Sequence, residues 1–138
     1  MNADPALRIL ALDDDPVNMS LIRAIVSRAG DPAIREATLH EATTLAAARD
    51  VLAREPIDIL LLDVHLPDGL GLDLATDLRR SGGADLAIIA LTASVLPADQ
   101  QAALDAGCDA FLAKPYPAAA LVATISELAR RPRLGELP

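Results

Sequence analysis

Short runs rich in aliphatic residues alternate along this chain with longer stretches of helical period, and this alternation constrains the fold more than any other feature. The apolar runs predict five strands, at Leu7–Leu12, Ile34–Leu39, Ile57–Leu62, Leu86–Leu91 and Ala110–Ala113. The stretches between them predict helices at approximately 16–29, 41–54, 70–80, 97–106 and 117–130. Strands that are apolar at every position are typical of a parallel sheet covered on both faces. The chain is therefore expected to fold as an α/β domain with a doubly wound parallel sheet.

The residues at the ends of the predicted helices fit this fold, which we expect to be flavodoxin-like, with five strands in the order 2-1-3-4-5 and helices on both faces. Pro16 and Pro97 stand where a first helical residue belongs, and Gly30 and Gly107 where a left-handed residue would end a helix. Two apolar stripes predict buried helix faces, one formed by Val17, Leu21, Ile22, Ile25, Val26 and Ala29, the other by Leu121, Val122, Ile125 and Leu128.

Composition limits the kind of protein. With 138 residues, 52% of them hydrophobic, the chain is long enough for one globular domain, predicted at residues 1–130 and followed by a short tail at 131–138. A net charge of −8 without a Lys/Arg cluster argues against nucleic acid as a partner. The single cysteine, Cys108, excludes an intramolecular disulfide and favours a reducing cytoplasm. The longest run of Ile, Leu and Val residues, Ile59–Leu62, is too short to span a membrane.

Acidic residues follow two of the predicted strands at the edge where doubly wound sheets carry their sites. Asp13, Asp14 and Asp15 follow the first strand, and Asp63 follows the third. Because these strands are neighbours in such a sheet, the carboxylates are expected to share one pocket, and a hard cation such as Mg²⁺ would offset their repulsion. A solvated loop is the alternative for Asp13 and Asp14, and Asp15 is interpreted as the N-cap of the helix that begins at Pro16.

A hydroxyl and an amine follow the last two strands. Thr92 ends the fourth strand, where it either satisfies strand-end backbone groups or, beside a phosphoryl site, donates to a phosphate oxygen. Lys114 ends the fifth strand and is the only lysine, which favours a site that needs a compact charge over a solvated edge position. Pro115 ends the strand, and the sequence leaves the isomer of the Lys114–Pro115 bond open.

Taken together, these strand-end residues resemble the receiver domain of bacterial two-component response regulators, over approximately residues 7–130. The resemblance implies that Asp63 is the phosphoacceptor, which takes a phosphoryl group from a phosphohistidine on a sensor histidine kinase or phosphotransfer protein. It also implies a Mg²⁺ site, with Mn²⁺ as a substitute, formed by Asp14 as a direct ligand, Asp13 through water, Asp63 and the backbone carbonyl of His65.

The same resemblance assigns the remaining site residues. Thr92 and Lys114 would bind phosphoryl oxygens, and Phe111, three residues before Lys114, stands at the aromatic switch position. His65 and Ser94, each two residues after a site residue, are expected to tune the phosphate lifetime. Whether the His65 imidazole orients water or lies on the pocket rim stays open. His40 is expected at the surface of the second helix.

The segments HLPDGLGL, ALTASVLPAD and AGCDAFLAKP are most similar to receivers of hybrid histidine kinases and to small stand-alone receivers. We therefore expect a cytoplasmic, single-domain regulator or phosphate shuttle of a phosphorelay. It would assist its own phosphorylation and dephosphorylation, without being an enzyme in the usual sense. Phosphorylation would switch its binding to a downstream protein through the fourth helix, fifth strand and fifth helix, without contacts to nucleic acid or membrane.

Three other interpretations use the same residues. ILALDDDPV also fits the opening of haloacid-dehalogenase-like phosphatases, with Asp13 as nucleophile and Asp15 as acid and base, but this leaves Asp63 without a role. A receiver-like adaptor that is never phosphorylated keeps the fold, although nothing in the sequence supports it. A dinucleotide site at Gly69-x-Gly71 lacks the third glycine and follows the wrong strand.

Overall fold

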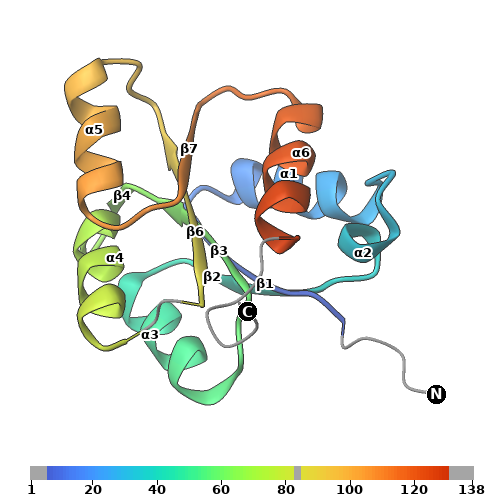
Figure 1. The fold of residues 1–138 in the computed structure, drawn as a ribbon, viewed down its shortest axis with the longest axis horizontal. Helices are drawn as coiled ribbons and strands as arrows, with labels where there is room; N and C mark the ends of the chain where they lie inside the picture. Colours follow the sequence, from blue (N-terminus) through green and yellow to red (C-terminus); the bar gives the residue numbers. More distant parts are fainter. Residues whose placement is uncertain (1–5, 83–84, 131–138) are drawn as a thin grey trace, which may run out of the picture.

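The predicted sheet is confirmed by the computed structural model, which describes residues 6–82 and 85–130, so that the expected tail at 131–138 lies outside the described residues. Five parallel strands lie in the order β2-β1-β3-β6-β7, which is order 2-1-3-4-5 along the chain (Figure 1). Their bounds are β1 Arg8–Leu12, β2 Thr38–Ala42, β3 Ile59–Asp63, β6 Ala87–Thr92 and β7 Ala110–Ala113. A small antiparallel pair that the sequence did not predict, β4 (His65–Leu66) and β5 (Gly69–Leu70), follows β3.

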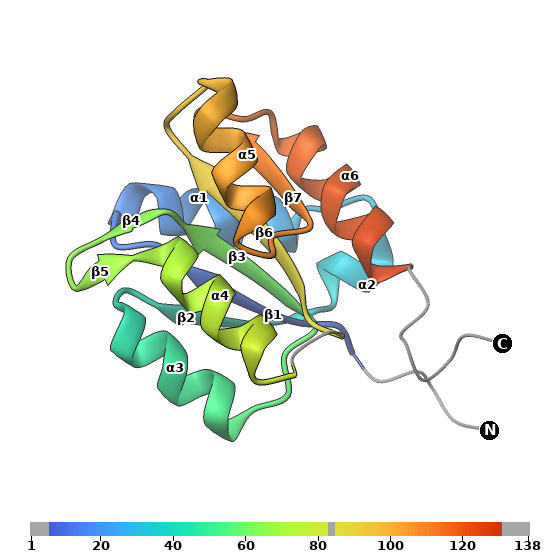
Figure 2. The ribbon, with the colours of Figure 1, turned by 60° about the vertical axis from the view of Figure 1, so that its left-hand side comes forward.

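Helices cover both faces of the sheet (Figures 1 and 2). Their bounds are α1 Pro16–Ser27, α2 Pro32–Arg35, α3 Leu45–Arg54, α4 Gly71–Arg80, α5 Pro97–Asp105 and α6 Ala118–Ala129. Alternate residues of the central strands point to opposite sides, so that Ile59 and Leu61 pack with α1, α2 and α6, whereas Leu60 and Leu62 pack with α3, α4 and α5. None of these four side chains is more than 1% exposed, which is why these four positions of β3 are apolar. Of the helices in 6–82 and 85–130, none combines the length and apolar character needed to cross a bilayer.

The strand predicted at Ile34–Leu39 is wrong at its start. Asp31 accepts a hydrogen bond from the backbone N–H of Ala33 at 3.0 Å and caps the short helix α2, which begins at Pro32. This helix start signal outweighs the aliphatic residues of the predicted segment, and the strand begins only at Thr38. The next helix, predicted from residue 41, consequently begins at Leu45, and His40 lies half-buried in β2 instead of on that helix.

Two details of α1 also differ from the prediction. Val17 and Leu21 are 74% and 47% exposed, because the sheet and α6 cover only the part of the stripe that contains Ile22, Ile25 and Val26. The helix ends at Ser27, before Gly30, and Gly30 is not among the glycines with positive φ. Pro16, Pro97 and Gly107 occupy their predicted positions, with φ at +106° for Gly107.

Candidate functional site

Three carboxylates meet at the carboxyl edge of the sheet. Leu12 of β1 pairs with Leu62 of β3, so that the next residues, Asp13 and Asp63, leave the sheet side by side. Carboxylate oxygens of Asp13, Asp14 and Asp63 all lie within 4.8 Å of one another. Asp13 and Asp63 are buried, at 1% and 8% exposure, whereas Asp14 is exposed. The predicted shared pocket therefore exists, with two carboxylates at its base and one at its mouth.

Lys114 connects the two buried carboxylates. Its backbone N–H donates to the carbonyl of Thr92 at 2.7 Å, directly after the paired ends of β6 and β7. Its Nζ donates to Asp13 Oδ2 at 3.1 Å and lies 3.4 Å from Asp63 Oδ1. The peptide bond to Pro115 is cis. The one lysine of the chain is thus part of the acidic pocket and does not lie on a solvated edge.

The orientation of the acidic residues is set by backbone groups. Asp13 Oδ1 accepts a hydrogen bond from the N–H of Asp15 at 2.9 Å, which fixes one carboxylate oxygen and leaves Oδ2 to Lys114. The carboxylate of Asp15 accepts from the N–H of Val17 at 2.9 Å and caps α1, as predicted. Asp15 is therefore the N-cap of α1, and it is not part of the three-carboxylate cluster.

The charges of the side chains in this pocket do not balance. Burial raises the pKa of Asp63, the charge of Asp13 raises it further, and Lys114 partly offsets both effects. Three carboxylates and one ammonium give a formal charge of −3 + 1 = −2. Tyr116 lies in the same field: burial first, and then Asp13 and Asp63, raise the pKa of its phenol to about 12. A cation with two charges would balance this cluster.

The remaining predicted site residues lie on β4, β6 and β7 and on the loop after β6, and they are buried to different degrees. Thr92 ends β6, is 6% exposed, and its Oγ1 accepts from the N–H of Ser94 at 3.0 Å. Phe111 lies half-buried in β7 and packs against the core on the side of α3, α4 and α5. The backbone N–H of His65 points at Asp63 Oδ1 across 3.4 Å, while the residue itself is exposed. This exposure places His65 at the rim of the pocket.

Two further residues, Gly71 and Asp68, were given no role at this site by the sequence analysis. A Cβ atom on Gly71 would lie 2.1 Å from the backbone oxygen of Asp63, so only glycine fits there. Asp68 accepts from the N–H groups of Leu45 and Ala46, at 2.8 and 3.1 Å, and so ties the β4–β5 turn to the start of α3. These hydrogen bonds lower the pKa of Asp68.

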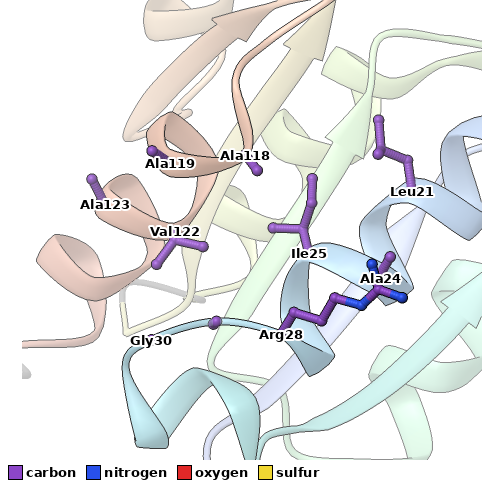
Figure 3. Close-up of a pocket in the computed structure, with 10 residues that line it drawn as sticks. Leu21, Ala24, Ile25, Arg28, Gly30, Ala118, Ala119, Val122 and Ala123 are labelled. Atoms are coloured by element: carbon purple, nitrogen blue, oxygen red, sulfur yellow. The ribbon is translucent and has the colours of Figure 1, made fainter.

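A groove between α1 and α6 is separate from the acidic cluster (Figure 3). Its volume is about 580 Å³, and apart from Arg28 its lining residues carry apolar side chains or none. Leu21 and Ile25 from α1 face Val122 from α6 across it (Figure 3). Because no carboxylate is among the lining residues, this groove contributes nothing to the acidic pocket.

Replacing Lys114 by Gln is expected to destabilise the metal-free protein by about 2 kcal/mol, less than for a fully buried pair because Lys114 is 20% exposed. The loss arises because Asp13 and Asp63 would face each other without a cation. Urea unfolding at neutral pH measures it, with Arg80→Gln, an exposed position on α4, as the control. Equal stability of the two variants would contradict an electrostatic role for Lys114.

The comparisons with known proteins agree with this geometry. The family model described as response regulator receiver domain matches residues 9–126. The aerobic respiration control sensor protein ArcB of Escherichia coli is 36% identical over 125 residues, which cover 89% of this chain and 15% of ArcB. The response regulator protein PmrA of Pseudomonas aeruginosa is 36% identical over 132 residues, covering 96% of this chain and 57% of PmrA. The chain therefore spans only part of these relatives.

Solved structures have the same fold. A response regulator from Chloroflexus aurantiacus superimposes with a TM-score of 0.79 at 26% identity and covers 92% of this chain and 100% of its own. A receiver domain from Francisella has a TM-score of 0.81 at 22% identity, over 91% of this chain and 98% of its own. The fold and the acidic pocket at its carboxyl edge are those of a signalling module, the receiver domain. The chain belongs to the response regulator receiver domain family.

Receiver domains bind Mg²⁺ through an acidic pocket, and the residues present here fit that ion. The ligand atoms are hard carboxylate oxygens, and the mouth of the pocket is open at Asp14, so that bound water can complete the coordination. The uncompensated charge of the cluster matches a divalent cation. A soft-metal site is not supported, because the one cysteine, Cys108, packs in the core on the α3, α4 and α5 side.

Proposed function

We propose that this chain accepts a phosphoryl group on Asp63 and uses it to switch the binding of a protein partner. The observation that carries the proposal is the contact set of one carboxylate: Asp63 lies with Asp13 and Asp14 within 4.8 Å and has Lys114 Nζ at 3.4 Å. An aspartate in this setting combines a nucleophilic oxygen with groups that offset charge on an incoming phosphate.

The proposed donor is a phosphohistidine on a histidine kinase or a phosphotransfer protein, the partners with which receiver domains interact. A carboxylate oxygen of Asp63 attacks the phosphorus atom, the bond from phosphorus to the imidazole nitrogen breaks, and an acyl phosphate forms. The departing imidazole keeps the electron pair of the broken bond. In this step Lys114 and the hydroxyl of Thr92 would bind phosphoryl oxygens, since Thr92 ends the strand next to that of Asp63 and Lys114 Nζ lies 3.4 Å from Asp63 Oδ1.

The proposed metal ligands are the carboxylates of Asp13, Asp14 and Asp63 with the backbone carbonyl of His65, for Mg²⁺ or, in its place, Mn²⁺. When bound, the ion would neutralise charge on the phosphoryl oxygens during transfer. Asp13 is held for this role by the N–H of Asp15, so that ligand binding would require little rearrangement at the base of the pocket. With these assignments, residues of the chain would themselves assist its phosphorylation and its dephosphorylation.

The switch would begin as a local charge change. A phosphoryl group adds about −1.5 to −2 charges and three acceptor oxygens, which draw Lys114 and Thr92 inward. Phe111 is half-buried on β7, which ends directly before Lys114 and pairs with the strand of Thr92, and it would repack when they move. The surface formed by α5, β7 and α6 would then change its affinity for a downstream protein. His65 at the rim and Ser94 on the following loop are the proposed determinants of phosphate lifetime.

The test is incubation of the purified protein with acetyl phosphate, with and without Mg²⁺, followed by intact mass measurement. One phosphoryl group per chain that depends on Mg²⁺ is the expected result. A protein that binds Mg²⁺ but never gains the phosphoryl mass would contradict the proposal. Uptake that is unchanged when Mg²⁺ is chelated would contradict the role of the acidic cluster.

A further inference from the structure

The loop between β6 and α5 is held by a chain of hydrogen bonds that runs from the site to the helix. Thr92 Oγ1 accepts from the backbone N–H of Ser94 at 3.0 Å. The hydroxyl of Ser94 donates to Asp99 Oδ2 at 2.5 Å and accepts from the N–H of Leu96 at 3.1 Å. Asp99 is the third residue of α5. A buried site hydroxyl is thereby linked to an exposed helix terminus through a single serine.

This linkage opposes the movement proposed for Thr92. The hydroxyl has one hydrogen to donate and accepts from Ser94, so moving it toward a phosphoryl oxygen requires the Ser94 amide to follow or the bond to break. Ser94 cannot follow freely, because its side chain is bonded to Asp99 on α5. A bond to a charged acceptor is stronger than one between neutral groups, and Asp99 is the charged member of this chain.

The same bonds hold an exposed apolar segment. Val95 and Leu96 are 70% and 61% exposed, and they lie between Ser94 and the start of α5 at Pro97. Leu96 is tied to Ser94 through its backbone N–H. Breaking the hydrogen bond between Ser94 and Asp99 would therefore allow Thr92 to move. It would also allow Val95 and Leu96 to change their positions at the surface.

We propose that Asp99 is a positioning residue which, through the hydroxyl of Ser94, holds Thr92 and the Val95–Leu96 segment in the arrangement without phosphate. The hydrogen bond between Ser94 and Asp99 thus opposes the change to the phosphorylated arrangement, and we call this effect the brake. This inference rests on the proposed phosphoacceptor function and adds its regulation. By linkage, a bond that must break when a phosphoryl group is bound lowers the affinity of the site for that group, and removing the bond raises it.

The first part of the test examines the bond without any phosphoryl group. In Asp99→Ala, amide hydrogen exchange at Ser94 and Leu96 is expected to be at least about threefold faster than in the wild type. Asp105→Ala is the matched control, because it removes the same charge from the same helix at an exposed position bonded to Gln101. Unchanged exchange in Asp99→Ala would overturn the proposal.

The second part measures the affinity for beryllofluoride, a phosphoryl mimic, in the presence of Mg²⁺. Asp99→Ala is expected to bind it about threefold to tenfold more tightly than the wild type, while Asp105→Ala is unchanged and Asp99→Asn, whose amide oxygen still accepts, lies between. Ser94→Ala is expected to bind more tightly as well, which separates the brake from an effect of Asp99 on helix α5.

The outcomes separate the brake from the function on which it rests. If the wild type binds beryllofluoride and Asp99→Ala binds it no more tightly, the brake is wrong and the phosphoacceptor function stands. If neither protein binds it, the phosphoacceptor function fails and the brake fails with it. Tighter binding that also appears in Asp105→Ala would assign the effect to net charge and contradict the role of Ser94.

Discussion

The Asp63→Asn variant is expected to take up no phosphoryl group from acetyl phosphate and Mg²⁺, while it remains fully folded. The substitution keeps the size and planar shape of the side chain but replaces the nucleophilic oxygen by an amide, which cannot form the acyl phosphate. Lys114 retains its hydrogen bond to Asp13 at 3.1 Å, so that the pocket keeps an ion pair. Intact mass after incubation measures the outcome, with Asp105→Asn, an exposed position on α5, as a control that should label like the wild type.

This variant is also expected to be more stable than the wild type at neutral pH without Mg²⁺. Burial and Asp13 raise the pKa of Asp63 in the folded state, so the native protein binds this proton more tightly than the unfolded chain does. Stability therefore falls as the pH rises from the usual aspartate pKa through the raised one, and at neutral pH the full penalty is present. Asn removes it. Thermal unfolding should show a higher Tm for Asp63→Asn at neutral pH and a smaller difference in acid. A lower Tm at neutral pH would contradict this account of the pocket.

Gly71→Ala is expected to destabilise the protein and to impair phosphorylation, although alanine normally favours a helix over glycine by about 1 kcal/mol. The added Cβ would lie 2.1 Å from the backbone oxygen of Asp63, and backbone atoms of a central strand cannot move away cheaply. Overpacking of this kind costs about 1–3 kcal/mol, and here it acts on Asp63, the proposed acceptor. Urea unfolding measures the stability, and the rate of labelling by acetyl phosphate measures the effect on the site.

Gly30→Ala is the matched control for this substitution. Nothing lies within 4 Å of a Cβ at Gly30, and this glycine is not among those with positive φ. Alanine there should therefore be neutral or stabilise by about 0.4–1 kcal/mol through the unfolded state. If both variants are as stable and as readily labelled as the wild type, the close approach of α4 to Asp63 has no functional importance.

The sheet order and the acidic pocket could be predicted because both depend on local patterns. Strands apolar at every position indicate a parallel sheet, and a parallel sheet brings its carboxyl ends to one edge, which is sufficient to place Asp13, Asp63 and Lys114 together. The second strand was misplaced for a local reason as well. It is an edge strand with mixed polarity, so the aliphatic residues Ile34, Ala37 and Leu39 placed the predicted strand too early in the sequence.

The supporting residues could not be predicted because their partners are distant in the sequence. Asp68 caps α3 across 23 positions, and a short Asp-Gly sequence reveals only a turn. Tyr116 lies in the electrostatic field of Asp13 and Asp63, and this position depends on the path of the chain after β7. The exposure of Val17 depends on how much of α1 the sheet covers, and a helical stripe does not contain that information.

The most direct test of the central claim locates the phosphoryl group chemically. The phosphorylated protein is treated with borohydride, which reduces an acyl phosphate of aspartate to homoserine, and the product is mapped by peptide mass spectrometry. Homoserine at position 63, in amounts that follow the phosphoryl adduct, is the predicted result. Homoserine at position 13 would assign the nucleophile to Asp13, as in a phosphatase, and would contradict the account. A phosphoryl adduct that yields no homoserine would contradict it as well, because the group would then not be carried by an aspartate.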